Sequence, residues 1–290
     1  MGTDDRSRVL VAVDDTGECD AALDYACVEA LTTGSVLELV HVSETSEPVD
    51  DQASASLNAS ARQDAEKRTE GRVSIESTVR RGPVVPVLVE ASASARLLVV
   101  QHRHESRLER LRHGSMAVSL AGRVHCRMVS VPEDWRLRAA RASGGNTALV
   151  TVGIDAIDAE TERILGHAFQ ACERENAVLH VVHAWSMSSP YDDALVDAAR
   201  EDEWATAYRA RLSHVLAAAR ADHPHVAVQV HVIHQDAASA LVDLSADSDL
   251  LLVGQGRGVH PLLDQLGSVP RAVLRDSSCP VEVVRTGLVP

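Results

Sequence analysis

Glycines and one serine near the carboxyl end of the sequence have the types and spacing of a phosphate-binding loop. An apolar run, Leu250–Val253, ends in a glycine-rich segment, and Gly267-Ser268 opens a helix-like stretch. The glycines of this segment are Gly254, Gly256 and Gly258. Glycines let the backbone approach an anion closely, and the first turn of a helix offers unpaired N–H groups at the positive end of its dipole. The stretch is therefore the strongest candidate for a nucleotide site.

Strands and helices in alternation would position this loop. The continuous apolar run Val9–Val13 is typical of a strand buried on both faces of a parallel sheet, and Val73–Val79 alternates as a strand does. The predicted strands are Val9–Val13, Val36–Val42, Val73–Val79, Arg96–Val100 and Val124–Val131. Helical spacing follows the first strand, where residues 14–17 could cap the helix, and recurs over Val84–Ala93. The polar segment Glu44–Arg72 is expected to begin as a loop and to become a solvated helix from about Ser56.

The pattern then repeats along the chain. Ala177–Trp185 matches Ser35–Ser43 and aligns His183 with His41, while Gly267-Ser268 repeats Gly114-Ser115. We therefore expect an α/β fold of two repeated, doubly wound domains with parallel strands and helices on both faces. The predicted bounds are 1–135 for the first domain, 136–146 for a linker and 147–290 for the second domain.

Composition and charge exclude several classes of function. The net charge is −14, and it divides into 22 acids against 15 bases up to Trp135 and 20 against 13 beyond, so each half is −7. Neither half has the basic surface that nucleic-acid binding requires. No apolar run reaches the roughly 20 residues of a membrane span, and five scattered cysteines suit a reduced compartment. The sequence predicts a cytoplasmic protein that binds neither nucleic acid nor membrane.

Several of these stretches together resemble the universal stress protein family, and the whole chain resembles a tandem member. The resemblance rests on VLVAVD near the start, on the LxxVHV strand and on LLLVGQGRG…LGSVPRAVLRDSSCPVEVVR at the end. It implies a five-stranded parallel sheet in each half. It also implies the pattern of ATP-binding members: glycine, two residues, glycine, nine residues, then glycine with serine or threonine. In such members an aspartate at the end of the first strand contacts the nucleoside.

The first half matches only part of this pattern. Asp14 stands at the end of the first strand, and Gly114 and Ser115 match the final pair. Gln101 and His104 occupy the positions of the two earlier glycines. Neither side chain can replace a glycine that must adopt positive φ or approach a phosphate.

The second half has the opposite defect. Gly254, Gly267 and Ser268 match, but the second glycine position falls on Arg257, and Gly153 replaces the aspartate. Asp155, two residues later, could substitute for it or could cap a loop. Because phosphate contacts outweigh one ribose hydrogen bond, worth roughly 0.5–3 kcal/mol, the second half is the better nucleotide candidate. The predicted site residues there are Thr151 and Val152 near the base, with Gly254, Gly256, Arg257, Gly258, Gly267, Ser268 and Val269 around the phosphates.

Other chemistry has weaker support. None of the fourteen histidines combines with cysteines or carboxylates at a metal-ligand spacing, so no metal site is predicted. His41 and His183 sit at matching strand ends, where a structural hydrogen bond is the simpler role. Ser115 and Ser268 could cap helices, and no serine-nucleophile motif surrounds them, so no catalytic residue is predicted.

Two functions follow from these observations. The first is a stress-response protein that binds ATP, with accompanying Mg²⁺, in the second domain and acts as a regulator, with slow hydrolysis or autophosphorylation left open. The alternative is a nucleotide-free tandem interaction module with degenerate motifs. The resemblance implies pairing of the two domains within the chain and leaves a homodimer open.

Overall fold

The computed structural model divides the chain into two compact units, Met1–Arg138 and Ala139–Pro290. It describes residues 7–14, 16–17, 19–44, 48–102, 115–136, 147–187, 189–193, 196, 198–256 and 266–285. The division falls inside the predicted linker, most of which lies outside the described residues, so the predicted domain bounds stay a prediction. Within the described ranges, no helix is long and apolar enough to cross a membrane.

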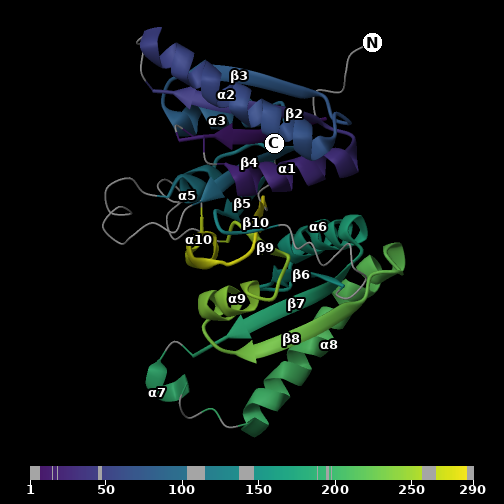
Figure 1. The fold of residues 1–290 in the computed structure, drawn as a ribbon. Helices are drawn as coiled ribbons and strands as arrows, with labels where there is room; N and C mark the ends of the chain where they lie inside the picture. Colours follow the sequence, from purple (N-terminus) through teal and green to yellow (C-terminus); the bar gives the residue numbers. More distant parts are fainter. Residues whose placement is uncertain are drawn as a thin grey trace. The chain divides into compact units, whose positions relative to one another are not determined.

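The first unit contains five parallel strands in the order β3-β2-β1-β4-β5 (Figure 1). The strands are β1 (Arg8–Val13), β2 (Val36–Ser43), β3 (Ile75–Arg81), β4 (Leu97–His102) and β5 (Arg127–Pro132). Val9, Leu10 and Val11 are all buried although successive side chains point to opposite faces, because helices cover both sides of the central strand. The outermost strand β3 instead has mostly exposed or half-buried residues.

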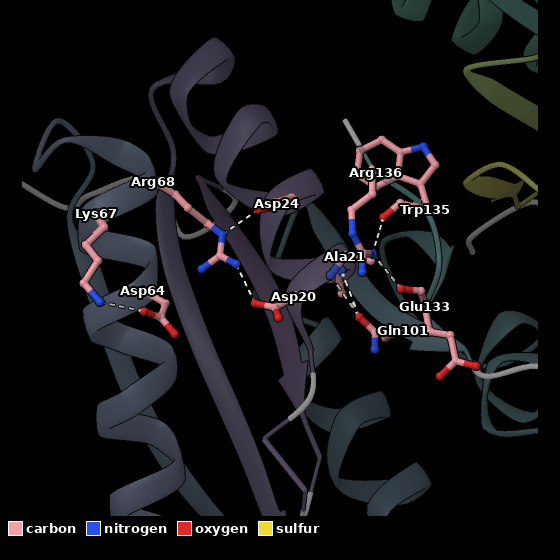
Figure 2. Close-up of polar contacts among 11 residues, drawn as sticks. Asp20, Ala21, Asp24, Asp64, Lys67, Arg68, Gln101, Glu133, Trp135 and Arg136 are labelled. Carbon is pink, nitrogen blue, oxygen red and sulfur yellow. Dashed lines mark hydrogen bonds and ion pairs between the residues drawn. The ribbon is translucent and has the colours of Figure 1, made fainter. Parts of the chain in front are cut away.

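Helices α1 and α2 cover one face of this sheet, and α3 and α5 pack together on the other (Figure 1). Their bounds are α1 (Asp20–Thr33), α2 (Pro48–Thr69), α3 (Val84–Ser92) and α5 (Met116–Ala121). Small residues such as Ala22, Ala26 and Ala30 face the sheet from α1 and are fully buried. Arg68 of α2 binds Asp20 and Asp24 of α1, which ties the two helices together at the surface (Figure 2).

The second unit repeats this arrangement, with parallel strands in the order β10-β9-β6-β7-β8. The strands are β6 (Ala148–Gly153), β7 (Ala177–Trp185), β8 (Val228–His234), β9 (Leu250–Gly254) and β10 (Val281–Val284). Helices α6 and α8 share a core with one face, around Phe169, and α9 and α10 pack together on the other. The helices are α6 (Ala159–Glu175), α7 (Pro190–Asp193), α8 (Ala198–Asp222), α9 (Ala237–Ser245) and α10 (Ser268–Asp276).

The sheet order confirms the predicted doubly wound α/β fold in each unit. The strands stay parallel, but the order in which the chain adds them reverses between β1 and β4 in the first unit, and between β6 and β9 in the second. Such a switch point opens a crevice at the carboxyl ends of the two strands, where doubly wound proteins place their ligands. In the second unit Gly153 and Gly254 end the two strands that flank this point.

Two local predictions were wrong. Helix α2 begins at Pro48, well before Ser56, with proline in the first turn where its missing N–H costs no hydrogen bond. The N-cap of α1 is Cys19, whose side chain makes no capping bond, and not a residue of the stretch 14–17. Asp14 instead accepts hydrogen bonds from the backbone N–H and the hydroxyl of Thr16, and so closes a local turn.

Candidate functional site

A cavity of about 250 Å³ lies at the switch point of the second unit. It is bounded by the ends of β6, β7 and β9 and by the first turns of α6, α9 and α10. Its lining residues are Gly153, Ile154, Asp155, Ala156, Asp158, Glu160, Thr161, Ile164, Val182, Ala184, Ala237, Leu241, Val253, Gly254, Gly256, Gly267, Ser268, Val269 and Pro270. Five predicted site residues thus meet at one cavity: Gly254, Gly256, Gly267, Ser268 and Val269.

Two glycines bring the backbone after β9 against the start of α10. Gly256 adopts a φ of +68°, a conformation that L-residues rarely take. A Cβ added at Gly256 or at Gly267 would lie 3.3 Å from the Cα of the other glycine. The N–H of Gly267 also donates a 2.7 Å hydrogen bond to the carbonyl oxygen of Gln255. The two segments can approach this closely only because both positions lack side chains.

The first turn of α10 presents hydrogen-bond donors at this cavity. Gly267 is the N-cap and provides no side-chain acceptor. Among the described residues, none accepts a hydrogen bond from the backbone N–H of Ser268 or Val269. Pro270 has no N–H, so the turn offers two free donors at the positive end of the helix dipole. This geometry suits an anion.

The opposite wall of the cavity is acidic. Asp155 is exposed in the β6–α6 connection, Asp158 is the N-cap of α6, and Glu160 lies in the first turn. The side chain of Asp158 accepts hydrogen bonds from the backbone N–H groups of Glu160 and Thr161, at 3.0 and 3.2 Å. None of the described lining residues is basic. An anionic group would therefore be favoured at the α10 side and disfavoured at the α6 side.

Gly153 has a packing role at the position where the sequence resemblance implies an aspartate. A Cβ built there would lie 2.7 Å from Cδ1 of Leu241, a residue of α9 that itself lines the cavity. The leucine side chain thus fills the space into which an aspartate would extend. Asp155 is the nearest carboxylate along the chain that reaches the cavity.

The other predicted residues of the second unit lie away from the cavity or outside the described ranges. The hydroxyl of Thr151 is buried and hydrogen-bonded to that of Ser248 at 2.7 Å, two residues deeper along β6 than Gly153. Val152 faces the opposite side of the sheet, in the core beneath α6. Arg257 and Gly258 fall outside the described residues.

The first unit uses its equivalent positions differently. The carboxamide oxygen of Gln101, at the end of β4, accepts hydrogen bonds from the backbone N–H groups of Ala21 and Ala22, at 3.1 and 3.3 Å (Figure 2). Gln101 therefore caps α1 from a neighbouring strand. Ser115 caps α5, accepting from the N–H of Val118 at 3.4 Å, and Gly114 lies outside the described residues.

The two aligned histidines make matching structural contacts. Nδ1 of His41 lies 3.0 Å from the carbonyl oxygen of Val13, and Nδ1 of His183 lies 3.0 Å from that of Ile154. Each contact joins neighbouring strands at their carboxyl ends, as expected from the sequence. Burial lowers the pKa of His183, which favours its neutral form. Across the described part of the chain, no three His, Cys, Asp or Glu side chains gather as metal ligands.

Several lining residues were not identified from the sequence. Asp158 and Thr161 form a capping box, in which each side chain accepts a hydrogen bond from the other residue's backbone N–H. Their spacing, Asp-x-x-Thr before a helix, was a signal that the sequence offered. By contrast, Val182, Ala184, Ala237 and Leu241 are ordinary apolar residues of a strand and a helix. Only the sheet order brings these residues to the cavity.

Fold and cavity together define a tandem, doubly wound α/β protein with a cavity at the switch point of its second unit. Residues 6–132 and 149–285 each match the universal stress protein family. The chain therefore belongs to the universal stress protein family, with two copies of its domain.

Relatives and solved structures agree with this assignment. A universal stress protein of Mycobacterium tuberculosis is 30% identical over 296 residues, with 96% of each chain covered. One from Mycolicibacterium smegmatis is 29% identical over 294 residues, again with 96% of each chain covered. The crystal structure of a universal stress protein from Archaeoglobus fulgidus shares the fold, with a TM-score of 0.67, 16% identity and 98% of each chain covered.

Proposed function

We propose that this protein binds an adenine nucleotide, with ATP as the leading candidate, in the cavity of its second unit. One observation carries the proposal: Gly254, Gly256 and the start of α10, all anticipated from the spacing of a phosphate loop, line a single cavity at the switch point. Doubly wound sheets place nucleotides at this position.

The electrostatics of the cavity suggest how the ligand would lie. The phosphates would meet the two N–H groups of the α10 turn, at Ser268 and Val269. The nucleoside would then extend toward β6, with Asp155 as the acceptor for ribose hydroxyls. The base would contact apolar residues at the strand ends, among them Ile154 and Val182.

The size and charge of the cavity bear on the form of the ligand. A cavity of about 250 Å³ lies just below the roughly 300–1,000 Å³ of small-molecule sites, so it suits a nucleoside with one phosphate enclosed. Further phosphates would extend past Gly256. Because the described lining has three carboxylates and no base, Mg²⁺ should accompany a triphosphate and offset the repulsion.

The proposed role of the bound nucleotide is regulatory. No described group at the cavity forms a nucleophile with an adjacent general base. Binding would instead stabilise the second unit, by roughly 2.7 kcal/mol when the ligand is present at 100 times its Kd. We propose that the protein binds the nucleotide in the cytoplasm. We also propose that the chain forms a homodimer, which light scattering would test.

A nucleotide-free interaction module is the second candidate, favoured by the first unit. There the side chain of Gln101 satisfies the N–H groups that begin α1, and Ser115 caps α5. In the first unit, side chains of the protein therefore accept hydrogen bonds from backbone N–H groups that could otherwise bind a ligand. In this candidate the chain would bind no nucleotide and would present a surface to a regulatory protein partner.

Calorimetry on the full chain tests the proposal. Ser268→Asp places a negative charge in the first turn of α10, where it favours the helix dipole but repels phosphate. We expect about one ATP site per chain in the wild type and at least a tenfold loss of affinity in Ser268→Asp, without a loss of thermal stability. Ser115→Asp, at the equivalent position of the first unit, is the matched control and should leave affinity unchanged.

Two further variants define the outcome. Gly267→Asp should abolish binding, because its side chain would occupy the tight approach to Gly256. Asp14→Ala should leave affinity unchanged; a large loss would assign the nucleotide to the first unit. Absence of both heat and a thermal shift at millimolar ATP would contradict the proposal.

A further inference from the structure

A cluster of titratable and aromatic side chains lies at the carboxyl ends of β7 and β8, apart from the cavity. His234 ends β8 and Trp185 ends β7. Trp185 follows Ala184, which lines the cavity, so its side chain points to the opposite face of the sheet, toward α8. The cluster is completed by Asp193 of α7 and by Glu201 and Trp204 of α8.

Both ring nitrogens of His234 contact carboxylates. Nε2 lies 2.8 Å from Oδ1 of Asp193, and Nδ1 lies 2.6 Å from Oε1 of Glu201. A neutral imidazole carries one N–H, so it can donate to only one of these oxygens and must turn a lone pair toward the other. Only the imidazolium satisfies both contacts, each as a charge-assisted hydrogen bond.

Aromatic rings hold His234 in place between these carboxylates. Its ring stacks on Trp185 with centroids 4.1 Å apart and planes at 9°. Trp204 meets Trp185 edge-on, with centroids 4.7 Å apart. A cation over an indole face is attracted by the ring quadrupole, so this stack also favours the protonated histidine. The side chain of His234 is only 15% exposed.

The same carboxylate connects His234 to the chain before α7. Oδ1 of Asp193 accepts a 2.6 Å hydrogen bond from the backbone N–H of Met187 as well as the contact from His234. Glu201 belongs to the first turn of α8. His234 thus joins two helices that are separate from it in sequence by 41 and 33 residues.

We propose that His234 is a proton-operated latch: as the imidazolium it fastens α7 and the first turn of α8 to the ends of β7 and β8, and as the neutral ring it releases them. Loss of the proton removes one hydrogen bond and leaves a carboxylate facing a lone pair at hydrogen-bond distance. The stack on Trp185 loses its cationic partner in the same step. The latch needs neither a ligand nor the cavity.

The charges around the latch set the pH at which it opens. Asp193 from α7 and Glu201 from α8 face the ring directly, and β7 contributes the uncharged Trp185. Asp202 and Glu203 add exposed negative charge to the same turn, against one base, Arg200. The hydrogen bond to Asp193, followed by that to Glu201, raises the pKa of His234 above its usual value. The stability that the latch contributes is therefore complete below the pKa of an unfolded histidine, about 6.5, and is lost as the pH rises through the higher folded-state pKa.

Tryptophan fluorescence and hydrogen exchange on the full chain test the latch. In a Trp135→Phe background the remaining indoles are Trp185 and Trp204. A stacked imidazolium quenches indole emission, so emission should rise with a midpoint above pH 6.5, and His234→Gln should remove this transition. Glu201→Gln should move the midpoint to lower pH. His214→Gln, an exposed histidine on α8, is the matched control and should leave the curve unchanged.

Hydrogen exchange separates a latch from a histidine that merely titrates. After correction for intrinsic rates, amides of α7 and the first turn of α8 should exchange faster above the midpoint, by about tenfold for each unit by which the pKa is raised. In His234→Gln they should exchange at the faster rate at every pH. If wild type and His234→Gln exchange equally at pH 6, or if emission shows no His234-dependent transition, the latch does not exist.

Discussion

Gln101 and Gly254 occupy equivalent positions at the ends of β4 and β9. The two positions differ because Gln101 has a side chain that can fill the space beside the strand end, and Gly254 has none. The carboxamide of Gln101 caps α1, whereas Gly254 leaves room at the cavity of the second unit. The sequence predicted that a glutamine could not act as a phosphate-loop glycine. It could not predict the capping role, because this depends on how close β4 lies to the start of α1.

Replacing Gln101 should cost stability without affecting nucleotide binding. Gln101→Ala removes the acceptor for the N–H groups of Ala21 and Ala22, so we expect a loss of about 1 kcal/mol in urea denaturation. Gln170→Ala, at an exposed position on α6, is the control and should change stability little. Weaker ATP binding in Gln101→Ala would show that the first unit contributes to the site.

Gly153 shows why the family aspartate cannot simply be restored in the second unit. Gly153→Asp places a Cβ 2.7 Å from Cδ1 of Leu241. We expect this overpacking to lower the free energy of unfolding by about 1–3 kcal/mol. Leu241→Ala in the same chain should offset part of the loss. If the double variant is no more stable than Gly153→Asp alone, the contact with Leu241 is not the cause.

Gly166 provides the matched control, because a side chain added there would have free space around it. It lies inside α6, and a Cβ added there would meet nothing within 4 Å. Gly166→Ala should therefore raise the free energy of unfolding by about 0.5–1 kcal/mol, because alanine restricts the unfolded chain more than glycine does.

Two of the three helices that begin at the cavity, α6 and α10, are capped in different ways. Helix α6 has a complete capping box between Asp158 and Thr161, whereas the N-cap of α10, Gly267, has no side chain to offer. A helix start without its own acceptor leaves donors for an external anion. The proposed phosphates therefore bind at the start of α10, and the start of α6 forms the opposite wall of the cavity.

Substitutions at the two helix starts should separate these roles. Asp158→Ala should cost about 0.5–2 kcal/mol of stability, because it removes the acceptor for two backbone N–H groups. Ser268→Ala should cost almost nothing, since its side chain caps no described N–H. Equal destabilisation of both variants in thermal unfolding would contradict the assignment.

Elements with strong apolar patterns could be predicted from the sequence. The continuous apolar runs that became β1, β4 and β9 predicted the class of sheet. Helix α2 was harder to delimit, because the residues that it buries at helical spacing are small or polar and leave no clear apolar stripe: Asn58, Ala61, Ala65 and Thr69. Cavity residues on β7 and α9 could not be predicted, since their composition is that of any buried strand or helix.

For the molecule as a whole, the charge balance makes a separate prediction. Each half of the chain carries −7, so the surface should repel polyanions at physiological salt. We expect no binding of duplex DNA in fluorescence anisotropy at about 150 mM salt, with at most weak association at low salt. Tight binding that persists at physiological salt would contradict the electrostatic argument.

The central claim is that one nucleotide binds in the second unit, and photoaffinity labelling tests it most directly. An azido-adenine nucleotide, bound to the full chain and activated by light, attaches where the base lies. We predict labelled peptides within residues 147–185, near the ends of β6 and β7, and protection by excess ATP. Protectable labelling confined to peptides of the first unit, or no protectable labelling at all, would contradict the account.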